Sequence, residues 1–150
     1  MKLNLSASLE DYLEAILELK MEKNKVRVTD LSNALGVKKS SVNTAIGKLK
    51  KLNLVYHERY EDIKLTWLGL EAAKKVKTKH DILFRFLSEF LGVDIGIADE
   101  DACKIEHIIS DETFGRVENF MNFIEKKALY DKSKWLKDFK AFIKDGQEVV

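Results

Sequence analysis

The feature that most limits the fold of this sequence is the absence of proline: none occurs in 150 residues, and glycine occurs only seven times. Proline interrupts helices more strongly than any other residue, so long helices can run here without a break. Flexible linkers between domains are rich in Gly, Ser or Pro, and the sequence contains no such stretch. We therefore predict a mostly α fold in which any domain boundary runs through a helix.

Charge and hydropathy narrow the class of protein. Lys and Arg number 26 against 25 Asp and Glu, a formal net charge of +1, which argues against a protein that simply coats nucleic acid. No apolar run approaches the roughly 18 residues of a membrane span. The N-terminal apolar stretch contains acidic residues, which a secretory signal excludes. We expect a cytoplasmic protein that does not contact a membrane.

The first half of the chain has the order of a helix-turn-helix. Apolar spacing predicts helices at residues 8–20, 31–35 and 39–52. Ser8 is the expected N-cap of the first helix, and Thr29 or Asp30 that of the second. Gly36 offers the left-handed conformation that ends the second helix. A short helix, a glycine turn and a second helix together indicate a DNA-binding motif.

Downstream of this motif the period changes from helical to alternating. Residues 55–60 and 63–66 read as a β-hairpin, which is a wing when it follows a helix-turn-helix. A long helix then runs from the N-cap Thr66 to Gly92. Three amphipathic stretches follow, at residues 100–109, 111–127 and 132–143. We predict a winged helix-turn-helix domain at 1–73, joined by the long helix to a small all-α domain at 74–150.

Basic residues gather on the predicted recognition helix. The segment from Lys38 to Lys51 holds five lysines and no acidic residue, so it suits contact with the phosphates of double-stranded DNA. Polar side chains near the start of the helix are candidates for reading bases in the major groove. The candidate DNA contacts are Lys38, Lys39, Ser40, Ser41, Asn43, Thr44 and Lys48. The alternative is that these lysines only solubilise an exposed helix face.

A second group of residues has the spacing of a metal site. Cys103, Glu106 and His107 stand at i, i+3 and i+4, which places them on one helix face. A thiolate, a carboxylate and an imidazole are ligand types that divalent transition metals use. The alternative is a half-buried cysteine beside a solvated Glu–His pair. Asp11 and Glu14 share a face of the first helix and could complete the shell, although an acidic first turn also suits the helix dipole.

The order of these motifs resembles the metal-dependent repressors of the diphtheria toxin repressor family. The resemblance rests on S-L-E-D-Y-L-E at 8–14, S-S-V at 40–42, K-H at 79–80 and D-A-C-K-I-E-H-I-I-S-D-E at 101–112. It implies that Cys103, Glu106 and His107 bind the activating metal, as in the iron-responsive branch. It also implies that His80 binds metal, as in both branches.

The predicted site combines features of two branches of that family. Asp11 and Glu14 look like the carboxylate pair of the manganese transport regulators, whereas Cys103 is an iron-type residue. Phe84 replaces a ligand of the second iron-type site. Asp99 stands where that branch has a histidine, so it could be an outlying ligand. The lack of a third, SH3-like domain before Val150 also resembles the manganese-type regulators.

These observations lead to one functional prediction and two alternatives. We predict a homodimeric repressor, not an enzyme, that binds operator DNA when loaded with Fe(II) or Mn(II). The predicted dimer faces are Leu83, Phe86, Leu87 and Phe90, and Phe114, Val117, Phe120, Met121 and Ile124. One alternative is a winged-helix regulator that metal does not activate, with a structural Cys-Glu-His face. The other is a metalloenzyme that uses these three residues to activate water.

Overall fold

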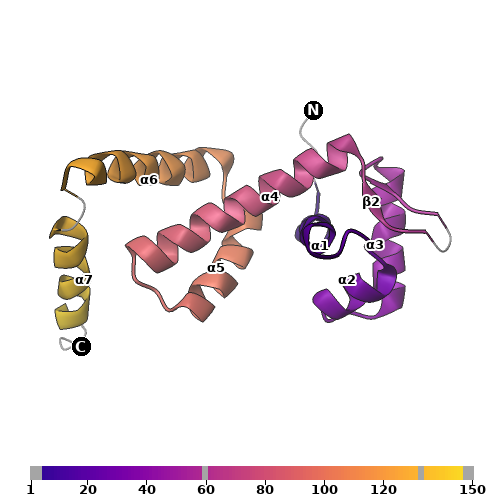
Figure 1. Cartoon of the computed structure of the whole chain (residues 1–150), viewed down its shortest axis with the longest axis horizontal. Helices are drawn as coiled ribbons and strands as arrows, with labels where there is room; N and C mark the ends of the chain where they lie inside the picture. Colours follow the sequence, from indigo (N-terminus) through magenta and orange to yellow (C-terminus); the bar gives the residue numbers. More distant parts are fainter. Residues whose placement is uncertain (1–4, 59–60, 132–133, 147–150) are drawn as a thin grey trace. The chain divides into compact units, whose positions relative to one another are not determined.

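The computed structural model describes residues 5–58, 61–131 and 134–146 of the chain. The chain divides into two compact units, Met1–Thr78 and Lys79–Val150, and each is described by itself. The described part consists mainly of helices with one two-stranded sheet (Figure 1), as the sequence predicts. The division between the units falls inside helix α4, Trp67–Arg85. The predicted domain boundary after residue 73 stays a prediction.

The first unit is a helix-turn-helix followed by a small wing. Its elements are α1 (Ala7–Lys23), α2 (Val28–Ala34), α3 (Lys39–Lys51), β1 (Val55–Tyr56), β2 (Lys64–Leu65) and the first half of α4. The strands pair antiparallel, with Val55 opposite Leu65. Each strand has only two residues, so the hairpin is shorter than predicted. Arg59 and Tyr60, assigned to the first strand by the sequence, lie outside the described residues.

Two predicted helix caps are wrong by a few residues. Helix α1 begins at Ala7 after Ser6, whose carbonyl accepts a hydrogen bond from the Leu9 N–H at 2.8 Å, so Ser8 lies inside the helix. Helix α2 begins after Arg27, and the Asp30 carboxylate accepts from the Arg27 backbone N–H at 2.9 Å. Asp30 therefore reaches back from the first turn instead of standing before it.

The left-handed residue expected after α2 is present. Gly36 has a φ of +64°, which an L side chain rarely adopts. Asn24 and Asn53 take the same conformation after α1 and α3, with φ of 62° and 57°. Asparagine tolerates left-handed backbone better than most residues, so these two helices end without the glycine that marks the end of α2.

The core of the first unit joins all its elements. Ile63 donates its backbone N–H to the Val26 carbonyl at 2.8 Å, which ties the wing to the segment after α1. The largest fully buried side chains are apolar residues from the helices, the connecting segments and β1: Leu13, Ile16, Val26, Leu31, Val42, Ile46, Leu49, Leu54, Val55 and Ile63. Their burial fixes the helix-turn-helix against the wing through apolar contact.

The wing is also locked to the start of α4, through Thr66. The Thr66 hydroxyl donates to the Asn53 carbonyl at 2.8 Å and accepts from the Gly69 N–H at 2.9 Å, so Thr66 is the N-cap that the sequence predicts. Gly69 packs directly on the backbone of Leu54: a Cβ at this position would lie 1.9 Å from the Leu54 carbonyl oxygen. This glycine is therefore required by close packing.

The second unit is all helical in its described part. It contains the second half of α4, a π-helical turn η1 (Phe86–Phe90), α5 (Ile95–Ile108), α6 (Asp111–Asp131) and α7 (Lys134–Gly146). Gly92, with φ of +74°, follows η1 at the position where the sequence predicts the end of the long helix. The first residues of the predicted last helix, Lys132 and Ser133, lie outside the described residues.

Helix α5 starts five residues earlier than the predicted position, residue 100. Asp94 caps it by accepting from the backbone N–H groups of Gly96 and Ile97, at 2.9 and 3.4 Å. This cap adds one turn, and Asp99 lies within the helix as a result. No helix among the described residues is long and apolar enough to cross a membrane.

Candidate metal centre and nucleic-acid interface

Helix α3 has a buried apolar face and an exposed polar face. Val42, Ala45, Ile46 and Leu49 are buried, which fixes the rotation of the helix about its axis. All the predicted DNA contacts are exposed: Lys38, Lys39, Ser40, Ser41, Asn43, Thr44 and Lys48. Thr44 Oγ1 donates to the Ser40 carbonyl at 3.0 Å, so its proton is already used within the helix. Asn43 is thus the stronger candidate for reading a base.

One lysine of the basic segment faces the wing. Lys50 Nζ lies 2.9 Å from the His57 carbonyl oxygen and 2.7 Å from Glu58 Oε1. The hydrogen bond and charge of Lys50 lower the pKa of Glu58. This contact connects the end of α3 to the wing, so the lysines of the segment do not form one uniform phosphate-binding surface. The residue count alone could not separate this role from the others.

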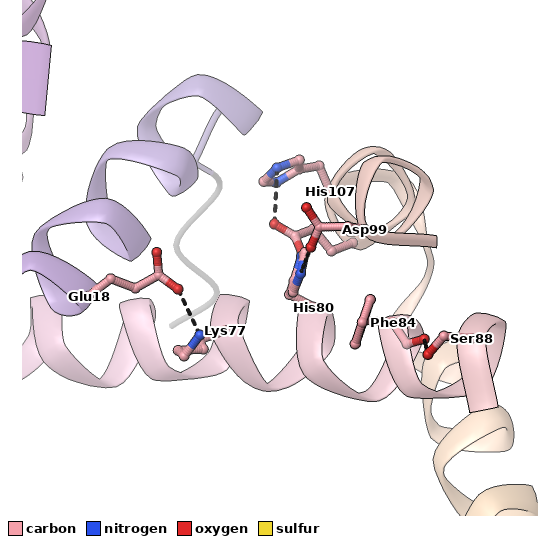
Figure 2. A network of polar contacts seen from close by, with 8 residues as sticks. Glu18, Lys77, His80, Phe84, Ser88, Asp99 and His107 are labelled. Atoms are coloured by element: carbon pink, nitrogen blue, oxygen red, sulfur yellow. Dashed lines mark hydrogen bonds and ion pairs between the residues drawn. The ribbon is translucent and has the colours of Figure 1, made fainter. Parts of the chain in front are cut away.

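The centre of the second unit is a carboxylate with no solvent exposure. The Glu106 side chain is 0% exposed, and one of its oxygens faces each of two imidazoles. Oε2 lies 2.9 Å from His80 Nδ1, and Oε1 lies 3.3 Å from His107 Nε2. Figure 2 labels the two histidines. The Glu106 side chain is not solvated, so the predicted alternative of a solvated Glu–His pair does not describe this arrangement. Burial of a carboxylate is unfavourable without a compensating charge.

Cys103 and His107 converge with Glu106 on one face of α5. Each residue places one donor atom within 4.8 Å of the donor atoms of the other two, as the i, i+3 and i+4 spacing predicts. Cys103 is exposed, so it is not the half-buried core residue of the alternative reading. Together with His80, these residues form what we call the ligand cluster.

His80 joins the ligand cluster from the second half of α4. Its Nδ1 faces Glu106, and its Nε2 lies 3.2 Å from Asp99 Oδ1. The Phe84 ring, one turn further along α4, lies nearly parallel to the imidazole, with an interplanar angle of 7° and centroids 6.4 Å apart (Figure 2). Phe84 therefore offers this histidine an apolar neighbour at the position where a ligand of the iron-type second site would stand.

Asp11 and Glu14 belong to the other compact unit. Both lie on α1, three residues apart and half-buried, so they share a helix face as predicted. Burial, and secondarily the charge of Asp11, raises the pKa of the neighbouring Tyr12. Within the second unit, the structure thus brings Cys103, Glu106 and His107 together and places His80 against Glu106. It places the carboxylate pair on one face of α1 in the first unit.

The donor atoms of the ligand cluster fit a divalent transition metal. Glu106 Oε1 is buried and accepts no hydrogen bond from the described residues, a state that a bound cation would stabilise. Imidazole, carboxylate and thiolate are all ligands of Fe(II), and imidazole and carboxylate are also ligands of Mn(II). Adjacent ligands of an octahedral ion with bonds of about 2.1 Å lie about 3 Å apart, which is close to the two Glu106–imidazole distances of 2.9 and 3.3 Å.

Comparison with known protein families covers most of the chain. Residues 4–63 match the N-terminal DNA-binding domain of the iron dependent repressors. Residues 66–132 match the metal binding and dimerisation domain of the same family. The first match contains the helix-turn-helix and the first strand of the wing, β1, and it ends one residue before β2. The second contains His80, Asp99, Cys103, Glu106 and His107.

Individual relatives agree with the family matches. An uncharacterised HTH-type transcriptional regulator of Methanocaldococcus jannaschii is 43% identical over 125 residues, which are 83% of this chain and 100% of that protein. The HTH-type transcriptional regulator MntR of Bacillus subtilis is 34% identical over 119 residues, which are 79% of this chain and 83% of that protein.

Solved structures give the same result for the fold. IdeR of T. acidophilum superposes with a TM-score of 0.67 at 31% identity, over 75% of this chain and 53% of that one. A manganese-dependent transcriptional repressor solved with manganese superposes with a TM-score of 0.70 at 29% identity, over 77% of this chain and 53% of that one. The chain thus spans about half the length of these solved proteins. With the family matches and the curated relatives, these results show that the chain belongs to the iron dependent repressor family of metal-dependent transcriptional regulators.

Proposed function

We propose that this protein is a homodimeric repressor that binds double-stranded operator DNA when it is loaded with Fe(II) or Mn(II). The ligands are Asp11, Glu14, His80, Cys103, Glu106 and His107. The observation that carries the proposal is the buried Glu106 carboxylate, whose oxygens lie 2.9 and 3.3 Å from two imidazole nitrogens. A divalent cation would compensate the charge of this buried carboxylate, and the neighbouring imidazoles and thiolate are donors that such a cation uses.

The proposed mechanism is thermodynamic linkage between metal binding and DNA binding. Ligands from the first helix and from the second unit select one arrangement of the DNA-binding unit, and DNA prefers the same arrangement. Metal therefore raises the affinity for DNA, and DNA raises the affinity for metal by the same factor. Helix α3 makes the proposed contacts with DNA: its lysines bind phosphates, and Asn43 reads the edge of a base.

The proposal includes a homodimer because a single helix-turn-helix reads only a few base pairs. A two-fold dimer places two recognition helices on half-sites one helical turn apart, which gives a palindromic operator. The dimer forms through the second unit. Phe120 and Phe123 on α6 are 47% and 56% exposed and supply apolar surface for it, whereas Leu83, Phe90 and Met121 of the predicted faces are buried and belong to the core.

The preferred metal is Fe(II), because Cys103 contributes a soft thiolate to an otherwise hard donor set. Asp11 and Glu14 act in the opposite direction, since carboxylate oxygens suit Mn(II). The same residues have no catalytic part in this proposal. A metal that regulates DNA binding needs neither a general base nor a substrate pocket beside it.

The test is a DNA-binding titration under anaerobic conditions with Fe(II), with Mn(II) and with metal-free protein. We expect the metal-free protein to bind operator DNA weakly, and either ion to raise its affinity by roughly 5–150-fold, with a larger effect for Fe(II). Equal affinity with and without metal would identify the alternative, a winged-helix regulator with a structural Cys-Glu-His face. A His107→Ala variant that still responds to metal would remove His107 from the ligand set.

A further inference from the structure

The two ring nitrogens of His80 each face a carboxylate of a different kind. Nδ1 lies 2.9 Å from Oε2 of Glu106, whose side chain is fully buried, whereas Nε2 lies 3.2 Å from Oδ1 of Asp99. The Asp99 side chain is 66% exposed. Figure 2 shows the imidazole of His80 on α4 with Asp99 close to it on α5. All three residues belong to the second compact unit.

The chemistry of metal-binding histidines distinguishes these two contacts. A histidine that binds metal through one nitrogen usually donates its other ring N–H to a carboxylate, which fixes the tautomer and the ring orientation. The two N–O distances, 2.9 and 3.2 Å, are each compatible with a hydrogen bond and with two ligands of one ion. The contacts differ in solvation, because the Glu106 side chain is 0% exposed and the Asp99 side chain is 66% exposed. The buried carboxylate gains more from a cation than the solvated one does. Since the two nitrogens point away from each other, an ion on Nδ1 lies on the side of the ring away from Asp99.

The surroundings of the ring support this assignment. Phe84 lies nearly parallel to the imidazole, with 6.4 Å between the ring centroids, and gives the ring an apolar neighbour that offers it no hydrogen bond. Asp99 stands one helical turn before Cys103 on α5 and remains largely in water. A solvated carboxylate loses little when it accepts one hydrogen bond, so Asp99 can orient the ring without the desolvation that metal ligation requires.

We propose that Asp99 is a positioning residue: it accepts a hydrogen bond from Nε2–H of His80 and thereby makes Nδ1 the nitrogen that binds the metal. The inference rests on the proposed function, since it assumes that His80 is a ligand. It specifies the donor atom of His80 and gives Asp99 a role other than direct ligation.

The first experiment identifies the nitrogen that binds. The full-length protein is labelled with ¹⁵N in its histidine rings, loaded with ¹¹³Cd(II) and examined by NMR. The chain has three histidines, His57, His80 and His107, so single substitutions assign each ring. We expect coupling from cadmium to Nδ1 of His80 and a proton on its Nε2. Coupling to Nε2 would overturn the inference alone, because His80 would still be a ligand. Absence of coupling to either nitrogen would overturn both this inference and the inclusion of His80 in the proposed site.

The second experiment separates a positioning role from ligation. Asp99→Ala should lower the affinity for Cd(II) and Mn(II) about tenfold, at the lower end of the effect of losing such a partner. Asp99→Asn keeps a carbonyl oxygen that can accept from Nε2–H, so it should retain most of the affinity and the Nδ1 coupling. Glu100→Gln, which removes one charge from the neighbouring exposed position on α5, is the matched control and should change neither. Equal losses in Asp99→Asn and Asp99→Ala would indicate direct ligation and overturn the positioning role.

Discussion

At the scale of single residues, Cys103 is the side chain on which the choice of metal depends. Cys103→Glu replaces a soft donor with a hard one, so the DNA-binding response should shift from Fe(II) towards Mn(II). The measurement is the ratio of the two metal concentrations that give half-maximal DNA binding under anaerobic conditions. His107→Ala is the internal control, because it should abolish the response to both ions while leaving the fold intact. If Cys103→Ala changes neither activation nor selectivity, the thiol is not a ligand.

A second residue-scale prediction separates two kinds of DNA contact on α3. Lys39→Ala or Lys48→Ala should weaken binding to all sequences and reduce the salt slope of log K by about 0.9 per lost phosphate contact. Asn43→Ala should leave the slope unchanged and reduce discrimination at one base pair by about 1–3 kcal/mol. The measurement is affinity for operator and random DNA at several salt concentrations. An unchanged slope in both lysine variants would contradict the assignment to phosphates.

The part of the site that the sequence predicts is the part that is local in the chain. Cys103, Glu106 and His107 lie within one helical turn, so their spacing alone places them together. The contact of His80 with Asp99 joins residues 19 positions apart and depends on the packing of two helices. The register of that packing cannot be read from either helix alone. The burial of Glu106 could not be predicted for the same reason.

At the scale of secondary structure, the junction between the wing and α4 gives a sharp test. Gly69→Ala would normally favour a helix by about 1 kcal/mol, but its Cβ would lie 1.9 Å from the Leu54 carbonyl oxygen. We therefore expect a net loss of about 1–3 kcal/mol in the free energy of unfolding, measured by chemical denaturation. Gly115→Ala is the control, since a Cβ there has no neighbour within 4 Å and should not destabilise the protein.

Helix order and type are well predicted here, whereas helix ends are not. The 3.6-residue and two-residue periods identify α1, α3, α4 and the wing because each has a clear apolar face. The ends depend on single caps that several neighbouring residues could provide. At α5 the cap is Asp94. Gly96 lies in the first turn, and because glycine has a low helix propensity, the sequence did not predict that the helix begins there. This early turn carries Asp99, the residue to which we assign the positioning of His80.

At the scale of the whole molecule, association should depend on the exposed aromatic residues of α6. Phe120 is 47% exposed and meets Phe86 edge-on, with centroids 6.3 Å apart. Phe120→Glu places a charge in the proposed apolar interface, so we expect sedimentation velocity to show monomers at micromolar concentration, with weaker operator binding. Met21→Glu, at a 74% exposed position of the first unit, is the matched control and should stay dimeric. A Phe120→Glu dimer as tight as wild type would locate the interface elsewhere.

Metal should also stabilise the folded chain. An ion that binds only the native state adds about 2.7 kcal/mol to the free energy of unfolding when its free concentration is 100 times its Kd. We expect Mn(II) to raise the melting temperature of the wild type and a chelator to reverse the change. Glu106→Gln and His107→Ala should lose most of this increase. An equal increase in these variants would mean that the stabilising ion binds at another site.

The buried carboxylate of Glu106 has a consequence for the lifetime of the protein in a cell. A carboxylate held away from water without its cation weakens the native state, and proteases act mainly on chains that have opened or unfolded. Cells starved of metal should therefore degrade this regulator faster than replete cells do. The number of repressor molecules would then fall with the metal supply, so that derepression results from turnover of the protein as well as from its release from DNA.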